Sequence, residues 1–126
     1  METSPQSSIL MLGNDLALAY LIGRYAQQSG YVVTTLPGEV KAEAVFALSP
    51  AAILFTSVES LEQAQPLIAG LANSDIPVLV CSSVADEARA RELGADHCLL
   101  HPLTYESFHK TLAATHEHGE DDHRSS

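Results

Sequence analysis

Side chains that could do chemistry stand at the ends of four apolar runs of this chain. Asn14 with Asp15, then Thr56, Ser82 and His101, each lie at or just after the end of such a run. An amide, a carboxylate, two hydroxyls and an imidazole could hydrogen-bond a ligand or bind an anion. They do not supply the several carboxylates that Mg²⁺ prefers, and Thr56 has no evident base to activate its hydroxyl. The pattern therefore favours recognition over catalysis.

Two of these residues allow a functional and a structural interpretation. Ser82 could bind an anion together with backbone N–H groups, but a local hydrogen bond at the strand end is the favoured interpretation. His101 could act as a cation below about pH 6.5, but a partly buried, hydrogen-bonded histidine is favoured.

Motifs of known catalytic chemistry are missing from the sequence. It has no G-x-S-x-G elbow, no Walker phosphate loop and no Cys–His pair at a recognisable strand end. Cys81 and Cys98 lie in apolar runs, which predicts buried free thiols. A disulfide between them would need Cα atoms within about 7 Å and side chains on one face. We therefore expect a protein that is not an enzyme and has no cofactor.

The end of the chain is acidic and rich in histidine. His116, His118 and His123 could bind Ni²⁺, Zn²⁺ or Cu²⁺ weakly, but a solvated tail without fixed ligand geometry is favoured, and no metal is expected. We predict a disordered N-terminus over residues 1–7, one domain over residues 8–115 and a disordered tail over residues 116–126.

The charge balance excludes several classes of partner. Sixteen acidic residues against six basic ones give a net charge of −10 over 126 residues. Such a surface repels nucleic acid and anionic membranes. No apolar run approaches the roughly 20 residues that span a bilayer, and the N-terminus lacks the features of a signal peptide. A cytoplasmic protein is expected.

Five runs of apolar and β-branched residues predict strands buried in a sheet. Turn residues such as Gly13-Asn14 and Pro37-Gly38 separate strands from helical segments. The predicted strands are Ile9–Leu12, Tyr31–Leu36, Ala51–Thr56, Ile76–Ser82 and Cys98–Leu100.

A helix is predicted after each strand. Asp15 and Thr104 are placed to cap the first and the last helix. The third is the least regular, because Ser60 with Gln63 resembles a capping box while Pro66 suits a first helical turn or a kink. The predicted helices are Leu16–Gln28, Glu39–Leu48, roughly 61–72, Val84–Leu93 and Thr104–Thr115.

Strict alternation of five strands and five helices predicts an α/β fold with helices on both faces of a parallel sheet. Right-handed crossovers limit the topology. We expect a flavodoxin-like (βα)5 doubly wound sheet with strand order 2-1-3-4-5, whose ligands sit at the carboxyl ends of the strands.

Two stretches carry a resemblance to a known family. Ile76-Pro-Val-Leu-Val-Cys-Ser-Ser reads as a fourth strand, and Gly94-Ala-Asp followed by Leu99-Leu-His-Pro102 reads as a fifth strand with its loop. From about Ser8 to Ala114 the chain resembles the response-regulator receiver domains of two-component systems. The resemblance implies a cis peptide between His101 and Pro102.

The resemblance also indicates which chemistry is missing. Gly13 and Asn14 stand where the family has an acidic pair, and Thr56 stands where it has the phosphoacceptor aspartate. Phosphoryl transfer needs that nucleophile, a Mg²⁺ ion and a cation for the phosphoryl oxygens. Asp15 is adjacent but is expected to cap a helix. The pocket of Gly13, Asn14, Asp15, Thr56, Ser82 and His101 is therefore expected to be a degenerate phosphoacceptor pocket.

The switch positions of the family are also altered. The Ser/Thr of the fourth strand is retained as Ser82, the lysine is replaced by His101 and the aromatic residue of the fifth strand by Cys98. The expected function is an atypical stand-alone response-regulator receiver, a pseudo-receiver in phosphorelay signal transduction. It is not phosphorylated and acts through protein–protein interaction with a signalling partner or as a homodimer.

Receivers commonly bind partners through their fourth helix, fifth strand and fifth helix, and a solvated face is the plainer interpretation of any single residue there. The candidate interface consists of Arg89, Arg91, Glu92, Thr104, Tyr105, His109 and Lys110. An alternative function is a small-molecule or anion sensor that uses the neutral pocket of Asn14, Thr56, Ser82 and His101.

Overall fold

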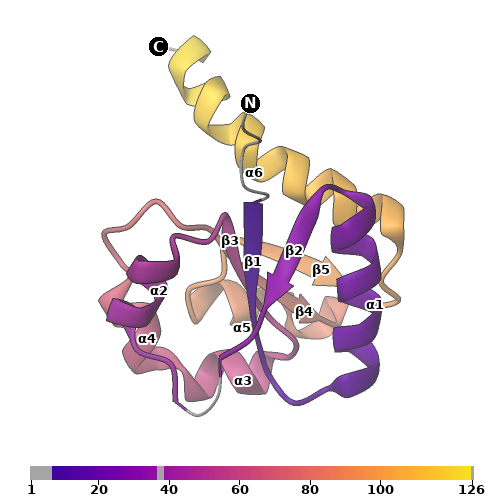
Figure 1. Ribbon diagram of the computed structural model, residues 1–126, viewed down its shortest axis with the longest axis vertical. Helices are drawn as coiled ribbons and strands as arrows, with labels where there is room; N and C mark the ends of the chain where they lie inside the picture. The colour runs from indigo at the N-terminus through magenta and orange to yellow at the C-terminus, as the bar shows by residue number, and fades with distance from the viewer. Residues whose placement is uncertain (1–6, 37–38, 126) are drawn as a thin grey trace, which may run out of the picture.

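The computed structural model describes residues 7–36 and 39–125, with side chains up to residue 115. The predicted turn at Pro37-Gly38 lies outside the described residues. Within them, five parallel strands form one sheet with the order β2-β1-β3-β4-β5, which confirms the predicted fold (Figure 1). The strands are β1 Ser7–Leu12, β2 Tyr31–Thr34, β3 Ala52–Phe55, β4 Val78–Ser82 and β5 His97–Leu100.

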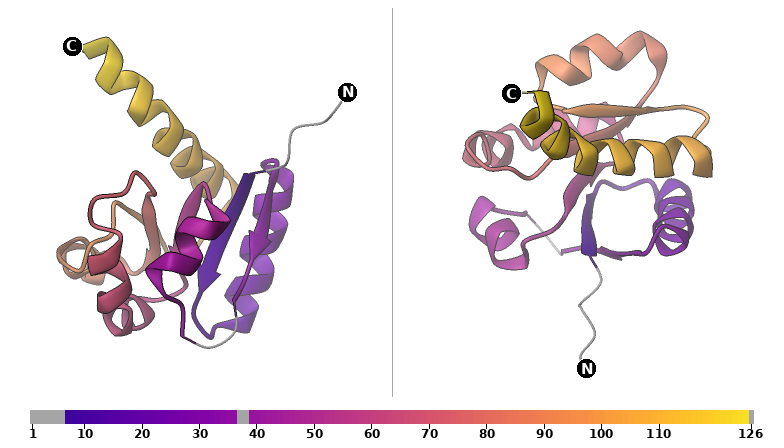
Figure 2. Two further views of the ribbon diagram at one scale, coloured as in Figure 1. Left: turned by 60° about the vertical axis from the view of Figure 1, so that its left-hand side comes forward. Right: turned by 90° about the horizontal axis from the view of Figure 1, so that it is seen from above.

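Helices cover both faces of this sheet (Figures 1 and 2). α1 and α6 pack on one face, and α2 to α5 pack on the other. The helical elements are α1 Leu16–Gln28, α2 Ala42–Leu48, α3 Val58–Gln63, α4 Gln65–Gly70, the short 3-10 helix η1 Val84–Asp86, α5 Glu87–Glu92 and α6 Tyr105–Ser125.

Alternation along the strands divides the core into two layers. In β1, Ile9 and Met11 join the layer under α1 and α6, while Leu10 joins the layer under α2 to α5. Phe108 of α6 is fully buried in the first layer and Phe55 of β3 is fully buried in the second. Both faces of the strands are apolar because both are covered, as is usual for a parallel sheet.

The first helix forms where the sequence predicts it. The Asp15 carboxylate accepts a hydrogen bond from the Leu18 backbone N–H at 3.0 Å and so caps α1. Thr104 Oγ1 accepts one from Ser107 N at 3.1 Å, at the start of α6. Both predicted caps are confirmed.

The third helical segment differs from its prediction. It is divided into α3 and α4 by Ala64, whose backbone leaves the helical geometry, and Pro66 lies in the first turn of α4. The capping box belongs to Ser57 and Ser60, not to Ser60 and Gln63: Ser60 N donates to Ser57 Oγ at 3.1 Å, and Ser57 N donates to Ser60 Oγ at 3.2 Å. A serine at the fourth position can close the box because its hydroxyl is both donor and acceptor.

Other boundaries also move. α2 begins at Ala42 instead of Glu39, because Lys41 is extended and Val40 packs against the core. The segment predicted as one helix over Val84–Leu93 starts with the 3-10 turn η1 before α5.

The predicted disordered ends also differ at their inner boundaries. Ser7 pairs with Tyr31 and belongs to β1, not to the N-terminal segment. α6 continues past Thr115 to Ser125, where the sequence predicts a tail. No proline follows Pro102, so no residue forces the helix to end at Thr115. The domain limit at residue 115 stays a prediction.

Candidate functional site

Four loops follow the carboxyl ends of β1, β3, β4 and β5, and because the strands are parallel these loops share one edge of the sheet. They carry the predicted site residues. Gly13 to Asp15 follow β1, Thr56 follows β3, Ser82 ends β4 and His101 follows β5. The structure brings only part of this set together.

Gly13 and Thr56 lie in direct contact. Thr56 is 4% exposed, and its backbone N–H donates to the Leu12 carbonyl at 2.9 Å. A Cβ placed on Gly13 would lie 1.8 Å from Thr56 Oγ1, and Gly13 has a φ of +132°. The threonine side chain thus occupies the space that any side chain at residue 13 would need.

A pocket of about 390 Å³ opens beside Thr56. Asp15 and Glu59 are the charged residues in its lining, and no cationic side chain is among the described residues that line it. His101 and Ser82 are not part of it. Its lining residues are Asn14, Asp15, Thr56, Ser57, Glu59, Ser60 and Gln63.

The Mg²⁺ ion that the receiver fold implies does not fit these residues. Asp15 already caps α1, and among the side chains described, residues 7–36 and 39–115, no three His, Cys, Asp or Glu are grouped as metal ligands. A hydroxyl stands in place of the nucleophile. No phosphoryl-transfer step can be derived from such a site.

Ser82 is buried without a partner. It is 3% exposed, and Oγ has no hydrogen-bond partner of ordinary geometry among the described residues, so the predicted local hydrogen bond at the strand end is not seen. The Cys98 thiol lies close enough for the Ser82 hydroxyl to lower the pKa of that thiol, but the two groups do not reach hydrogen-bonding geometry. By alternation along β4 the hydroxyl faces the apolar layer under α2 to α5, to which Val78 and Val80 belong.

Replacing Ser82 with alanine should therefore cost little. We expect Ser82→Ala to leave the free energy of unfolding unchanged or to raise it by up to about 1 kcal/mol, because an unsatisfied hydroxyl is removed from the interior. Ser83→Ala is the matched control: Ser83 Oγ accepts from Asp86 N at 3.3 Å, and losing this cap should cost about 0.5–1 kcal/mol. Urea unfolding of both variants measures the difference; a loss above about 1 kcal/mol for Ser82→Ala would show that its hydroxyl has a partner.

His101 is exposed, so the favoured interpretation of a partly buried histidine is wrong, and the residue does not line the pocket. Its backbone N–H donates to the Ser82 carbonyl at 3.1 Å, and the peptide between His101 and Pro102 is cis, as the receiver resemblance implies. The imidazole lines no pocket beside the loops after β1 and β3, so nothing in this arrangement places it as a substitute for a pocket lysine.

Both thiols are free, and their positions exclude a disulfide between them. Cys98 is paired in register with Val80, so it faces the layer under α2 to α5, whereas Cys81 belongs to the opposite layer. Burial raises the pKa of Cys81 to about 12, with a further contribution from Asp15. Burial also raises the pKa of Cys98, which Arg91 lowers in turn. Cys81 is buried and Cys98 half-buried.

The candidate interface residues divide between two surfaces. Arg89 forms an ion pair with Glu62 at 2.7 Å, and Arg91 contacts Glu87 at 3.5 Å, while Glu92 is exposed on the same helix.

Tyr105 and His109 lie on the other side of the sheet, against α1. The Tyr105 ring meets Tyr25 edge-on with centroids 5.7 Å apart, and His109 Nδ1 lies 3.2 Å from Ser29 Oγ. Thr104 caps α6 and Lys110 is exposed. Two of the seven residues therefore contact α1 or the residue that ends it.

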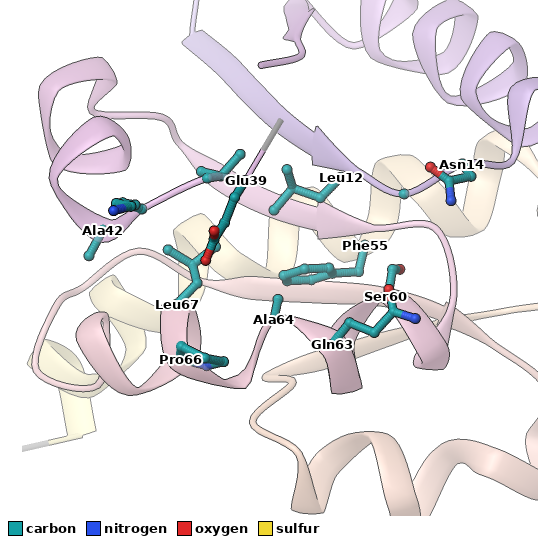
Figure 3. Close-up of a pocket in the computed structure, with 13 residues that line it drawn as sticks. Leu12, Asn14, Glu39, Ala42, Phe55, Ser60, Gln63, Ala64, Pro66 and Leu67 are labelled. Carbon is teal, nitrogen blue, oxygen red and sulfur yellow. The ribbon is translucent and has the colours of Figure 1, made fainter. Parts of the chain in front are cut away.

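A second, larger pocket lies next to the first and was not predicted. It has a volume of about 440 Å³ and shares Asn14, Ser60 and Gln63 with the smaller pocket (Figure 3). Its walls are the extended segment before α2 and the residues around Ala64, where α3 ends and α4 begins. The sequence pointed to this irregular segment only through Pro66, which suits either a first helical turn or a kink.

Comparisons with known proteins agree with the architecture. No protein-family model matches the chain, and no curated protein matches it in sequence. Among solved structures, it is similar to full-length FixJ from B. japonicum, with a TM-score of 0.68 and 16% identity over 97% of this chain and 63% of that one. The chain thus spans less than two thirds of the length of FixJ.

Two structures from Pseudomonas aeruginosa PAO1 are also similar. One is the receiver domain of a sensor histidine kinase with magnesium coordinated in its active-site cleft, with a TM-score of 0.68 and 18% identity over 86% of this chain and 95% of that one. The other is a CheY-like protein, TadZ, with a TM-score of 0.72 and 15% identity over 86% and 98%.

None of the described helices is long and apolar enough to span a bilayer. The sheet order, the two helical layers and these structural similarities together lead to one conclusion: the chain has the fold of the response-regulator receiver domains.

Proposed function

We propose that this protein is an atypical receiver-like protein of two-component signal transduction, which acts by binding a protein partner and is not switched by a phosphoryl group. The contact between Gly13 and Thr56 carries the proposal. A phosphoacceptor site needs a carboxylate nucleophile and a metal beside it, and here a threonine side chain fills the space next to a glycine.

The electrostatics support the same proposal. A phosphoryl group near Thr56 would meet Asp15 and Glu59 in the pocket lining and no cation among the described residues there. Like charges in such a site disfavour the bound anion by repulsion. For the same reason we rank the anion-sensor alternative below partner binding.

The proposed partner is a signalling protein or a second copy of the chain, in the cytoplasm. The candidate binding surface is the exposed face of α5, which carries Arg89, Arg91 and Glu92. Arg89 and Arg91 hold their carboxylate partners at exposed positions, where such pairs contribute little stability. They can therefore exchange partners at low cost.

Partner capture with and without a phosphodonor tests this proposal. Tagged protein is incubated with native-host extract, either alone or with acetyl phosphate and Mg²⁺, and the captured proteins are quantified. We expect the same partners in equal yield under both conditions. The double variant Arg89→Glu/Arg91→Glu should reduce the yield at least about fivefold, because reversed charges oppose complementary ones.

Arg24→Glu serves as the matched control, since this exposed cation lies on α1 and outside the candidate interface. A partner that is captured only with acetyl phosphate would contradict the proposal. If the α5 double variant and the wild type capture the partner in equal yield, α5 is not the binding surface.

A further inference from the structure

The larger pocket lies on the side of the sheet that α2 to α5 cover. Its floor is formed by Leu12 and Phe55, which are register partners at the carboxyl ends of β1 and β3. One wall is the segment from Glu39 to Ala42, and the other is formed by the end of α3 and the start of α4. Figure 3 shows the Phe55 ring lying between these walls. The volume of about 440 Å³ is in the range of small-molecule sites.

The interior of this pocket is lined by apolar side chains. Leu67 of α4 is 5% exposed and Phe55 is fully buried, so both belong to the packed core. α2 and α4 approach closely, since a Cβ on Gly70 would lie 2.9 Å from the Ala42 Cβ. The small side chains of Ala42 and Ala64 leave the space between the walls open. An apolar group could enter it without rearrangement of the core.

Two opposite charges line the same pocket. Glu39 and Lys41 are both exposed, and neither forms an ion pair with another described residue. Figure 3 shows the Glu39 side chain reaching from its wall toward Leu67, so the carboxylate lies over the apolar interior. Lys41 is the single cationic residue among the described lining. One acidic and one basic residue therefore both belong to the lining.

Side-chain amides complete the lining. Asn14 and Gln63 are exposed and lie where the two pockets meet. Amide groups can donate and accept hydrogen bonds at once, so they suit polar ligand groups of either charge. Apolar walls with a few polar groups at the mouth are the usual composition of a small-molecule site.

We propose that this pocket binds a small zwitterion with an apolar side chain, of the class of the free hydrophobic amino acids. The ammonium group of the ligand pairs with Glu39, its carboxylate pairs with Lys41, and its side chain packs against the half-buried Leu12, Ala42 and Ala64. This inference is independent of the proposed partner binding, which concerns α5.

Other ligand classes fit these features less well. A simple anion would use Lys41 alone and would meet both Glu39 and the net charge of −10. A simple cation would use Glu39 but would be opposed by Lys41. An uncharged apolar molecule would desolvate both charged groups without pairing them.

Three ligands of similar shape test the assignment. The ¹⁵N-labelled protein is titrated with L-phenylalanine, with phenethylamine, which lacks the carboxylate, and with 3-phenylpropionate, which lacks the amine. L-leucine is added as a smaller zwitterion. We expect a zwitterion to shift the backbone amides of Leu12, Val40, Ala42 and Ala64, and to bind at least about fivefold more tightly than either single-charge analogue.

Substitutions then separate the two charges. Glu39→Gln should weaken the binding of L-phenylalanine and phenethylamine about fivefold and leave the binding of 3-phenylpropionate unchanged. Lys41→Gln should weaken the binding of L-phenylalanine and 3-phenylpropionate about fivefold and leave the binding of phenethylamine unchanged. Glu43→Gln is the matched control, because Glu43 lies in the first turn of α2 and does not line the pocket. Ala64→Leu should abolish binding by filling the cavity.

Several results would overturn the proposal: no shift of these amides by either amino acid, single-charge analogues that bind as tightly as the zwitterion, or a Glu39→Gln effect no larger than that of Glu43→Gln. None of these results depends on whether partner capture responds to a phosphodonor.

Discussion

Gly13→Ala should destabilise the protein by about 2–4 kcal/mol. The new Cβ would overlap Thr56 Oγ1, and the φ of +132° at residue 13 is one that L-residues rarely adopt. Overpacking in a rigid interior costs about 1–3 kcal/mol, and alanine at a positive φ adds roughly 1 kcal/mol. Urea unfolding followed by circular dichroism measures the change.

Two further variants identify the cause. Thr56→Ala removes Oγ1, so the double variant Gly13→Ala/Thr56→Ala should recover part of the loss, and the coupling between the two sites should exceed about 1 kcal/mol. Gly23→Ala is the matched control: Gly23 lies within α1 and a Cβ there would meet nothing within 4 Å. That variant should gain about 0.5–1 kcal/mol from helix propensity. A harmless Gly13→Ala would refute the close contact with Thr56.

Phe108→Ala should destabilise the protein by about 3–5 kcal/mol, as is usual for a buried phenylalanine. Phe108 is fully buried in the layer that α1 and α6 share, and its ring lies 6.0 Å from that of Tyr25. Its removal would leave a cavity and loosen the attachment of α6 to the sheet. Thermal and urea unfolding measure the loss.

A chain that ends at Thr115 gives the contrasting result. If the domain ends at residue 115, as the sequence predicts, this truncation keeps Phe108 and Leu112 in the core and should change the free energy of unfolding by less than about 1 kcal/mol. A truncation as damaging as Phe108→Ala would place the domain limit further along α6.

Features that depend on local patterns could be predicted from the sequence. Apolar runs indicate the strands, and the spacing of strands and helices indicates the parallel sheet with its order. Asp15 is recognisable as a cap because a short polar residue precedes a helical pattern. The cis peptide at Pro102 follows from the family resemblance.

Features that depend on contacts between distant residues could not be predicted. Nothing in the sequence indicates that Thr56 Oγ1 lies where a Cβ of Gly13 would be, because the two residues are far apart in the chain and meet only through the pairing of β1 with β3. The unpaired hydroxyl of Ser82 and the pocket over Phe55 arise in the same way, from side chains on several elements.

Short-range competition explains the remaining errors. Ser57 and Ser60 both suit a helix cap, and the sequence does not say which one closes the box. Glu39 to Lys41 have helical propensity, but burying Val40 holds this segment extended. The contacts of Tyr105 with Tyr25 and of His109 with Ser29 were not predicted, because they join residues far apart in the chain.

An NMR titration decides whether this pocket can hold a phosphoryl group. The titrant is beryllofluoride with Mg²⁺, because beryllofluoride bound to a carboxylate mimics a phosphoryl group. A receiver that carries the acidic pair and the aspartate is titrated in parallel as the positive control. For this protein we predict no chemical-shift change at Asn14, Thr56 or Ser82 beyond that caused by salt alone, because Thr56 stands in place of the nucleophilic aspartate and no cationic side chain is among the described residues that line the pocket. Saturable shifts confined to these residues, dependent on both reagents, would contradict the proposed loss of phosphoryl switching.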